Sequence, residues 1–152
     1  MYAVVRVRGN VGVRRDAKDS LVMLRLKAQN NAMICQENRE WKGMLQKVKD
    51  WVTFGEIDKE TLAALLQKRL RTAGHKKVDG KILKDATSYD SFEKFADDLM
   101  SGKIKLKNFR MLKPFFRLTP PSKGFKSVKL HYPRGDLGYR GKEINKLLVR
   151  MI

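Results

Sequence analysis

Apolar and basic side chains alternate near the start of the chain. In residues 2–8, Val5 and Val7 point to one side of an extended backbone, while Arg6 and Arg8 point to the other. An alternation with period two is typical of a strand that has one buried face. The pattern therefore predicts a half-buried strand whose exposed face is basic.

The pattern then changes repeatedly between helical and strand periods. The glycines of residues 9–12 predict a turn, and apolar residues at helical spacing predict a helix over 17–28. Residues 31–36 predict a second strand, the apolar stripe of residues 38–48 predicts a second helix, and residues 51–57 predict a third strand. This order predicts an α+β fold with a small two-layer, ferredoxin-like β-α-β-α-β core, in which two helices cover one face of a three-stranded sheet.

The next stretch is more helical. Asp58 can cap a helix that has leucines at helical spacing over 62–70, and Asp90 with Glu93 has the spacing of a capping box before another apolar stripe. Residues 72–88, between these two helices, are polar and interrupted by glycine. They predict a loop or a marginal hairpin.

A long segment near the end follows neither period. Residues 113–118 predict a short strand and residues 144–151 predict an amphipathic helix, but PPSKGFKSVKLHYPRGDLGYRG, residues 120–141, lies between them without a continuous pattern. Loops of this length are uncommon in compact domains unless they are functional or disordered. The aromatic residues in it, the prolines at its start and the apolar helix after it argue against a solvated, mobile tail, but whether the loop is ordered before it binds a partner stays open.

The chain is strongly basic, and the excess is regional. It has 34 Lys and Arg against 16 Asp and Glu, a formal net charge of +18, and residues 102–152 hold 14 of the basic and 2 of the acidic residues. Such an excess destabilises a compact chain by self-repulsion and implies a polyanionic partner. No apolar run approaches the roughly 20 residues of a membrane-spanning helix, and arginine interrupts the apolar run of MYAVVRVRG, which does not predict a signal peptide.

The residues of the long loop are suited to RNA. Basic side chains alternate there with aromatic ones, so cations are available for phosphates and rings for stacking on unpaired bases. The glycine turn after the first strand is flanked by further arginines, and glycine lets a backbone approach phosphate closely. The predicted RNA-binding residues are Arg8, Asn10, Arg14, Arg15 and Lys18 around the turn, and Lys123, Lys126, Lys129, His131, Arg134, Tyr139 and Arg140 in the loop.

Signatures of catalysis and of cofactors are weak. Gly135, Gly141 and Lys142 resemble a phosphate loop, but their spacing is one residue too long. His75 and His131 have no Cys, His or carboxylate at metal-ligand spacing, so neither a metal nor a cofactor is predicted. The single Cys35 cannot form an internal disulfide and lies among apolar residues, which predicts a packed thiol in a reducing compartment.

Two other functions stay open at this point. A small RNA-modifying or RNA-cleaving enzyme would need His131 and a carboxylate to come together. A DNA-compacting chromatin protein would explain the charge, although such proteins typically insert helices or ribbons into a groove and have little need of a long aromatic loop.

Two C-terminal stretches, FRLTPPSKGFKSVKLHY and GDLGYRGKEINKLLVRM, resemble the archaeal and eukaryotic branch of the universal large-subunit ribosomal protein thirty family, whose eukaryotic member is called protein seven. The segments AVVRVRGNVGV and REWKGMLQKVKDWVTFGEI are similar to the first third of that family. The resemblance spans the whole chain except about residues 72–90. Because the first strand begins almost at the first residue, with no long basic extension before it, the archaeal type is favoured.

This resemblance implies both an organisation and a role. A core over residues 1–58 would be followed over residues 59–152 by an extension with helices, the basic aromatic loop 119–142 and a C-terminal helix, packed with the core as one unit. The protein would be a structural constituent of the large subunit, in the cytoplasm, with ribosomal RNA and neighbouring ribosomal proteins as partners. No catalysis, no small-molecule substrate and no membrane contact are implied.

Overall fold

The computed structural model describes all residues, 1–152, and has an α+β fold. The strands are β1 (Tyr2–Arg6), β2 (Asn31–Cys35), β3 (Val52–Glu56), β4 (Phe116–Arg117) and β5 (Gly138–Tyr139). The helices are α1 (Arg15–Met23), α2 (Arg39–Val48), α3 (Lys59–Arg69), α4 (Gly80–Thr87), α5 (Phe92–Met100) and α6 (Ile144–Met151), with two 3-10 turns, η1 (Leu106–Asn108) and η2 (Gly141–Glu143). No helix has the length and apolar character needed to cross a membrane.

All strands form one sheet, in the order β4-β2-β1-β3-β5. β1 pairs antiparallel with both β2 and β3, as expected for the β-α-β-α-β core. The sheet has five strands and not the three expected, because β4 pairs antiparallel with β2 and β5 pairs parallel with β3. The two added strands cover edges whose backbone groups would otherwise lack partners.

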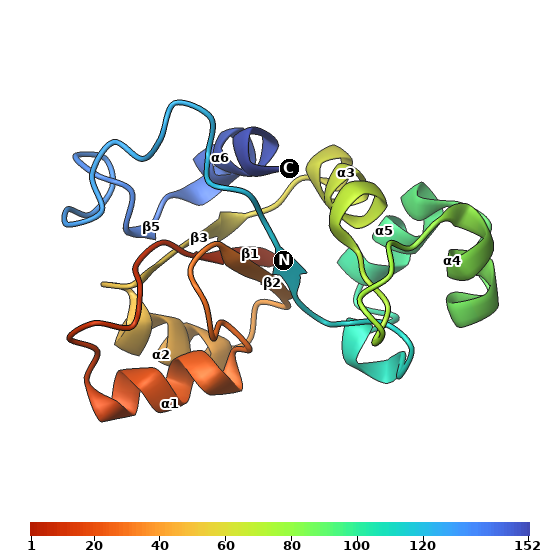
Figure 1. Ribbon diagram of the computed structural model, residues 1–152, viewed down its shortest axis with the longest axis horizontal. Coiled ribbons are helices and arrows are strands. Elements are labelled where there is room, and N and C mark those ends of the chain that lie inside the picture. The colour runs from red at the N-terminus through yellow and green to blue at the C-terminus, as the bar shows by residue number, and fades with distance from the viewer.

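Helices cover both faces of this sheet (Figure 1). Tyr2 and Val4 of β1 pack against α1 and α2, in a core cluster that also includes Leu21 and Leu45. Ala3 and Val5 point the other way, into a larger cluster with α3, α4, α5 and α6. The expectation of a half-buried first strand is therefore wrong: every residue of β1 is buried, because the extension covers the second face.

Arg6 is the largest correction within this strand. Its side chain was expected on an exposed basic face, but only 2% of it is exposed. The guanidinium donates hydrogen bonds of 2.6 to 2.9 Å to five neutral oxygens, which are the carbonyl oxygens of Arg8, Gly9, Leu26 and Lys27 and the Oδ1 atom of Asn10. Arg6 thus ties the glycine turn to the chain that follows α1.

The segment expected as a loop or hairpin contains a helix. Within residues 72–88, α4 occupies Gly80–Thr87 and buries Leu83 and Thr87 against the larger cluster. Only the beginning is hairpin-like, with an antiparallel bridge between Arg71 and Lys77. A helix of two turns has too few apolar positions for its period to stand out.

The cap of α5 also differs from the expectation. Ser91 is the N-cap, and its hydroxyl accepts a hydrogen bond from the backbone N–H of Glu93 at 3.2 Å. Asp90 lies one residue earlier and pairs with Lys84 instead. Gly102 follows the end of α5 with φ of 78°, a left-handed conformation that suits glycine in this position.

Candidate nucleic-acid interface

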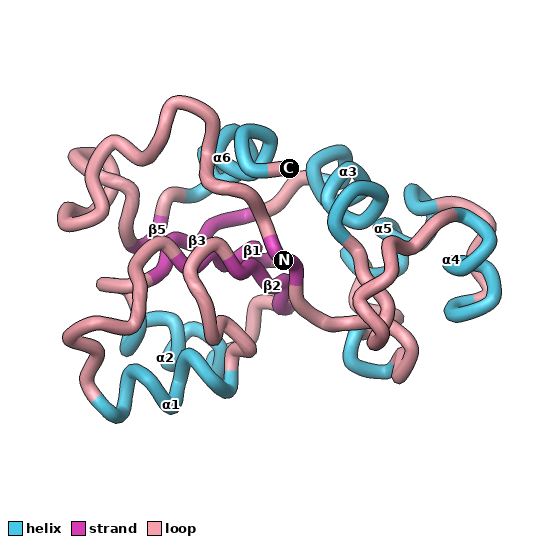
Figure 2. Tube along the Cα trace, viewed as in Figure 1, coloured by secondary structure: helices cyan, strands magenta, loops and turns pink.

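The two segments predicted to bind RNA lie at the same end of the molecule. Figures 1 and 2 show this end as loops, formed by the turn after β1 and by the long loop before β5. Both segments contact the turn between α2 and β3. Arg8 donates from its backbone N–H to the carbonyl oxygen of Trp51 at 3.1 Å, and His131 Nε2 lies 2.9 Å from Oδ1 of Asp50.

The start of the long loop is fixed to the end of α6. The backbone N–H of Thr119 donates to the carbonyl oxygen of Met151, and the backbone N–H of Ser122 donates to the carbonyl oxygen of Arg150. The Arg150 guanidinium in turn donates to the carbonyl oxygens of Ser122 and Gly124, at 2.5 to 2.9 Å. The C-terminal helix therefore holds the beginning of the loop as well as following its end.

A buried carboxylate holds the middle of the loop. Asp136 accepts hydrogen bonds from the backbone N–H groups of Lys126 and Ser127, at 2.5 and 3.3 Å, and from Nη2 of Arg140 at 2.5 Å. The Arg140 guanidinium also lies 5.3 Å from the centre of the Tyr132 ring. These contacts close the loop on itself, so it has a defined shape in the free protein.

The far end of the loop joins the sheet. Thr53 donates its hydroxyl hydrogen to the carbonyl oxygen of Gly138 at 3.2 Å, and the backbone N–H of Arg140 donates to the carbonyl oxygen of Phe54 at 2.9 Å. Gly138 has φ of 75°, a left-handed conformation that suits glycine. The chain thus enters β5 and then η2 directly beside β3.

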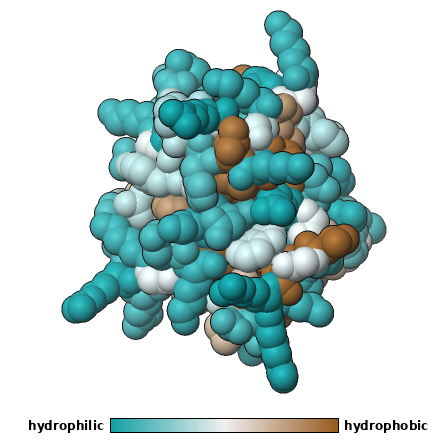
Figure 3. Space-filling view, turned by 90° about the vertical axis from the view of Figure 1, so that its left-hand side faces the viewer, coloured by the Kyte–Doolittle hydropathy of each residue, from teal (hydrophilic) through white to brown (hydrophobic).

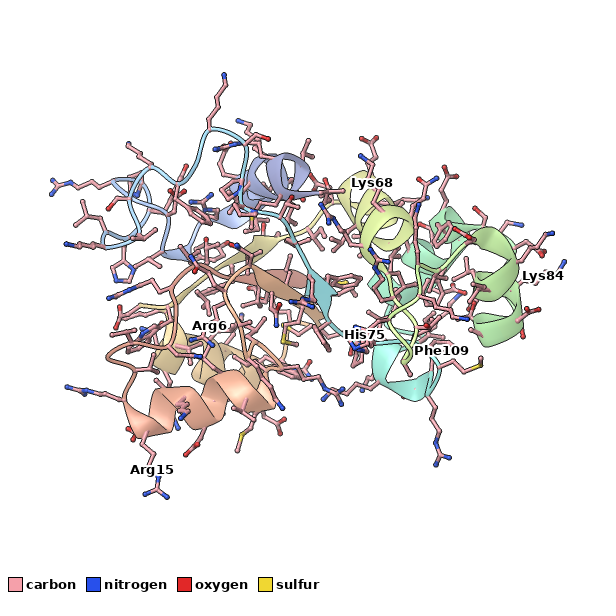
Figure 4. All side chains as sticks on the ribbon, viewed as in Figure 1. Arg6, Arg15, Lys68, His75, Lys84 and Phe109 are labelled. Atoms are coloured by element: carbon pink, nitrogen blue, oxygen red, sulfur yellow. The ribbon has the colours of Figure 1, made fainter.

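Six predicted cations are exposed and make no side-chain hydrogen bond or ion pair. They are Arg14, Arg15, Lys18, Lys123, Lys129 and Arg134, and we call this set the basic end. Figure 3 shows that hydrophilic side chains cover most of this face and that long ones extend from it, with small apolar patches between them. Figure 4 shows Arg15 pointing into solvent, whereas Arg6 lies inside the molecule.

The other predicted residues have partners within the protein. Tyr139 donates its hydroxyl hydrogen to Glu56 at 2.9 Å, and this hydrogen bond raises the pKa of the phenol above its ordinary value. Lys126 remains exposed, with its Nζ atom 3.3 Å from the carbonyl oxygen of Pro133. The Oδ1 atom of Asn10 accepts a hydrogen bond from the Arg6 guanidinium. Arg140 is buried, with only 8% of the residue exposed. In the free protein, Arg140 holds the loop in shape, and its contact with RNA stays a prediction.

Comparison with known proteins places the chain in a family. The family model described as Ribosomal protein L30p/L7e matches residues 2–52. The large ribosomal subunit protein uL30 of Archaeoglobus fulgidus is 49% identical over 151 residues, which cover 99% of both chains. Those of Methanocorpusculum labreanum and Thermoplasma volcanium are 49% and 45% identical, over 99% and 100% of this chain and 99% and 93% of their own. The chain belongs to the uL30 family.

Membership of the uL30 family confirms the resemblance found in the sequence and its archaeal type. The protein is a structural constituent of the large ribosomal subunit, in the cytoplasm, and not an enzyme. Binding of ribosomal RNA is typical of uL30 proteins, whose partners are that RNA and other ribosomal proteins. The chromatin alternative is thereby excluded.

The enzyme alternative had asked for a histidine beside a carboxylate. His131 and Asp50 do form such a pair, each with about half of its side chain exposed. In a uL30 protein this pair has a structural role. It fixes the loop to the turn before β3, where Asp50 lies 81 residues earlier in the chain than His131. No group of three or more His, Cys, Asp or Glu side chains is arranged to hold a metal ion.

Sequence reasoning missed the residues that shape the interface. Asp136 is one of only two acidic residues in residues 102–152, and an isolated carboxylate within a cationic loop was a signal that it has a structural partner. Arg6 and Arg150 gave no comparable signal, because their period placed them on exposed faces. For Arg6 only the fold reveals the burial, and for Arg150 only the fold reveals the loop carbonyls beside it.

Proposed function

We propose that this protein binds large-subunit ribosomal RNA through the basic end and the loop that presents it. The observation that carries the proposal is the meeting of the turn after β1 and loop 119–142 at Asp50 and Trp51. Segments more than 100 residues apart in sequence thereby present their unpaired cations on one side of the molecule.

The charges of the basic end support phosphate contacts. Its six side chains have no carboxylate partner, so their attraction for an external anion is not used up within the protein. The acidic residues that do form ion pairs include Glu37, Asp90, Asp97 and Glu143, which pair with other lysines. Phosphate oxygens are the groups that can neutralise such a set of free cations.

The shape of the loop supports contacts that set position more than sequence. The major groove of A-form RNA is too narrow for side chains, so duplex RNA is bound mainly through its backbone and shape. A loop held by Asp136 and by the end of α6 presents Lys129 and Arg134 at fixed places. We infer that these residues orient the protein on the folded RNA, and that exposed aromatic side chains such as Tyr132 stack on unpaired bases.

The test measures binding to purified archaeal large-subunit ribosomal RNA over a range of salt concentrations. If about six to ten phosphates are contacted, affinity falls about 10³–10⁵-fold between 50 and 200 mM salt. Lys129→Ala and Arg134→Ala should each weaken binding and lower the slope of log affinity against log salt by about one.

The matched control is Lys68→Ala, an exposed lysine without an ion pair on α3, away from the basic end (Figure 4). It should leave the slope unchanged. If Lys129→Ala and Arg134→Ala behave as Lys68→Ala does, the basic end is not on the RNA. Arg140→Ala is a poorer probe because it would also release Asp136 and disturb the loop.

A further inference from the structure

A groove lies on a part of the molecule that the basic end does not include. It runs between β2 with the start of α2 on one side and the chain after α5 on the other, and its volume is about 210 Å³. Most of its lining is apolar. We call it the β2 groove and define it by Met33, Ile34, Trp41, Leu99, Leu106 and Pro114.

The backbone of β2 opens into this groove. The pairing of β4 with β2 ends at Ala32, and continuing the same register places Pro114, which has no N–H, opposite Ile34. The direction of the Ile34 groups follows from Asn30, whose carbonyl oxygen points toward the β4 side and accepts from the N–H of Leu118 at 3.0 Å. Backbone groups alternate between the two edges of a strand, so the carbonyl groups of Ala32 and Ile34 point to that same side. The N–H and C=O of Ile34 therefore face the β4 side without a strand partner.

The rim of the groove is positively charged. Arg25, Lys105 and Lys107 line it, and no carboxylate does. Lys107 Nζ lies 5.3 Å from the centre of the Trp41 ring, so a cation stands directly beside the aromatic part of the lining. The groove combines an apolar interior, one free backbone donor–acceptor pair and a cationic edge.

We propose that the β2 groove receives one unpaired nucleotide of RNA, with the base inside against Ile34 and the phosphate between Arg25, Lys105 and Lys107. This rests on the proposed function, because it assumes that RNA is the partner, and adds a second, base-binding contact. Each feature of the groove has a counterpart in a nucleotide. An unpaired base has two apolar faces and an edge with hydrogen-bond donors and acceptors, and it carries a phosphate.

An extended peptide suits the groove less well. Addition of a strand needs a row of free backbone groups along an edge. Here β2 ends at Cys35, and the chain turns at once into α2, with the N–H of Asn38 donating to the carbonyl oxygen of Gln36 at 3.1 Å. Only one residue of β2 offers both groups, which is enough for a base and too little for a strand.

The groove also has an optical reporter. Trp41 lines it, and the only other tryptophan is Trp51, which does not. In a Trp51→Phe background, emission of Trp41 should be quenched when a single-stranded RNA hexamer of mixed sequence is added. Lys105→Glu and Met23→Glu change exposed residues that line the groove. Each should lower the affinity for the hexamer, measured by this quenching, about tenfold, which is within the range for loss of one stacked base.

Two control variants separate the groove from the rest of the surface. Met111→Glu changes another exposed methionine, which does not line the groove, and should leave the quenching unchanged. Arg134→Ala should weaken binding to whole ribosomal RNA and leave the hexamer quenching of Trp41 unchanged. Quenching by an acidic peptide but not by the hexamer, or no quenching by either, would overturn the nucleotide assignment.

Ultraviolet cross-linking of intact archaeal large subunits that contain this protein distinguishes the two proposals. RNA cross-links should form on the tryptic peptide 28–39, which borders the groove, as well as on peptides of loop 119–142. Cross-links on the loop peptides alone would overturn the groove assignment and leave the proposed function standing. Cross-links on neither would count against both.

Discussion

Arg6 shows how far a single side chain can depart from what its position in the sequence indicates. Its partners are five neutral oxygens and no carboxylate, so the buried cation is stabilised by hydrogen bonds alone. Burial lowers the pKa of the guanidinium from its ordinary value. The guanidinium supplies donors to carbonyl groups of two turns, and the hydrogen bond to Leu26 is fully buried, so loss of its donor there would cost free energy.

Replacing Arg6 should therefore cost much of the stability. Arg6→Met keeps the apolar stem but leaves several carbonyl groups without a donor, and the free energy of unfolding in urea should fall by about 3 kcal/mol. Arg15→Met, at an exposed position of α1, is the matched control and should change it by less than about 0.5 kcal/mol. Equal effects of the two changes would contradict the role assigned to Arg6.

The buried thiol of Cys35 gives a prediction about pH. Burial raises its pKa from the ordinary value of 9.0 to about 12. Between these values the unfolded chain releases the proton and the folded chain keeps it, so this group's contribution to stability is complete below pH 9 and is lost as pH rises toward 12. The stability difference between the native chain and Cys35→Ala, measured by urea unfolding, should narrow over that range. A constant difference would contradict it.

At the scale of elements, the sheet depends on the close approach of β3 to the chain after β5. A Cβ atom at Gly55 would overlap the carbonyl oxygen of Gly141 and press on the Cβ of Ile144. Only glycine lets η2 and α6 lie against the strand at this point. One absent side chain thus decides whether the end of the chain can complete the sheet.

Gly55→Ala should displace η2 and α6 and lower the free energy of unfolding by about 1–3 kcal/mol, because the backbone opposite cannot move freely. Gly43→Ala is the control. Gly43 lies within α2 with no atom within 4 Å of the Cβ it would gain, so this change should stabilise the protein by up to about 1 kcal/mol. Thermal or urea unfolding should show that Gly55→Ala lowers the free energy of unfolding and that Gly43→Ala raises it. A loss of stability in both variants would contradict the role assigned to Gly55.

Elements with several periods of apolar residues were predictable from the sequence. Those are β1, β2, β3 and the helices α1, α2, α3, α5 and α6, although α1 ends at Met23 and not near residue 28 as expected. Packing on both faces of the sheet was not expected, because only two helices on one face were predicted. β4 was expected as a short strand, but β5 has two residues and no period of its own, and it exists because β3 offers a free edge. Its discovery requires the tertiary fold. The sequence located the cations of the basic end in two separate segments, and only the fold shows that these segments meet. The burial of Arg140 likewise depends on its partner Asp136.

At the scale of the whole molecule, the two parts of the chain share one core. Ala3, Val5 and Ala32 of the first 58 residues lie in the same cluster as Leu66 and Leu148 of the rest. We propose that residues 1–58 and 59–152 form one cooperative unit, as the sequence predicted. Without the second part, one face of the sheet would expose its apolar side chains to water.

Chemical unfolding should therefore show one transition. Both tryptophans lie within residues 1–58 and report on the first part, whereas four of the six helices lie in residues 59–152 and dominate the far-ultraviolet dichroism. The two signals should give the same midpoint and the same slope against urea. Midpoints that differ beyond measurement error would show that the two parts unfold separately.

The single carboxylate of Asp136, enclosed by two backbone amides and Arg140, has a consequence for the time at which the loop takes its form. A cationic segment that must fold on its target loses conformational entropy at the moment of contact, and this loss weakens the complex. Here the entropy is lost earlier, during the folding of the protein itself. On the proposed function, the RNA meets a loop that is already ordered, and it is the RNA that must adapt to the protein.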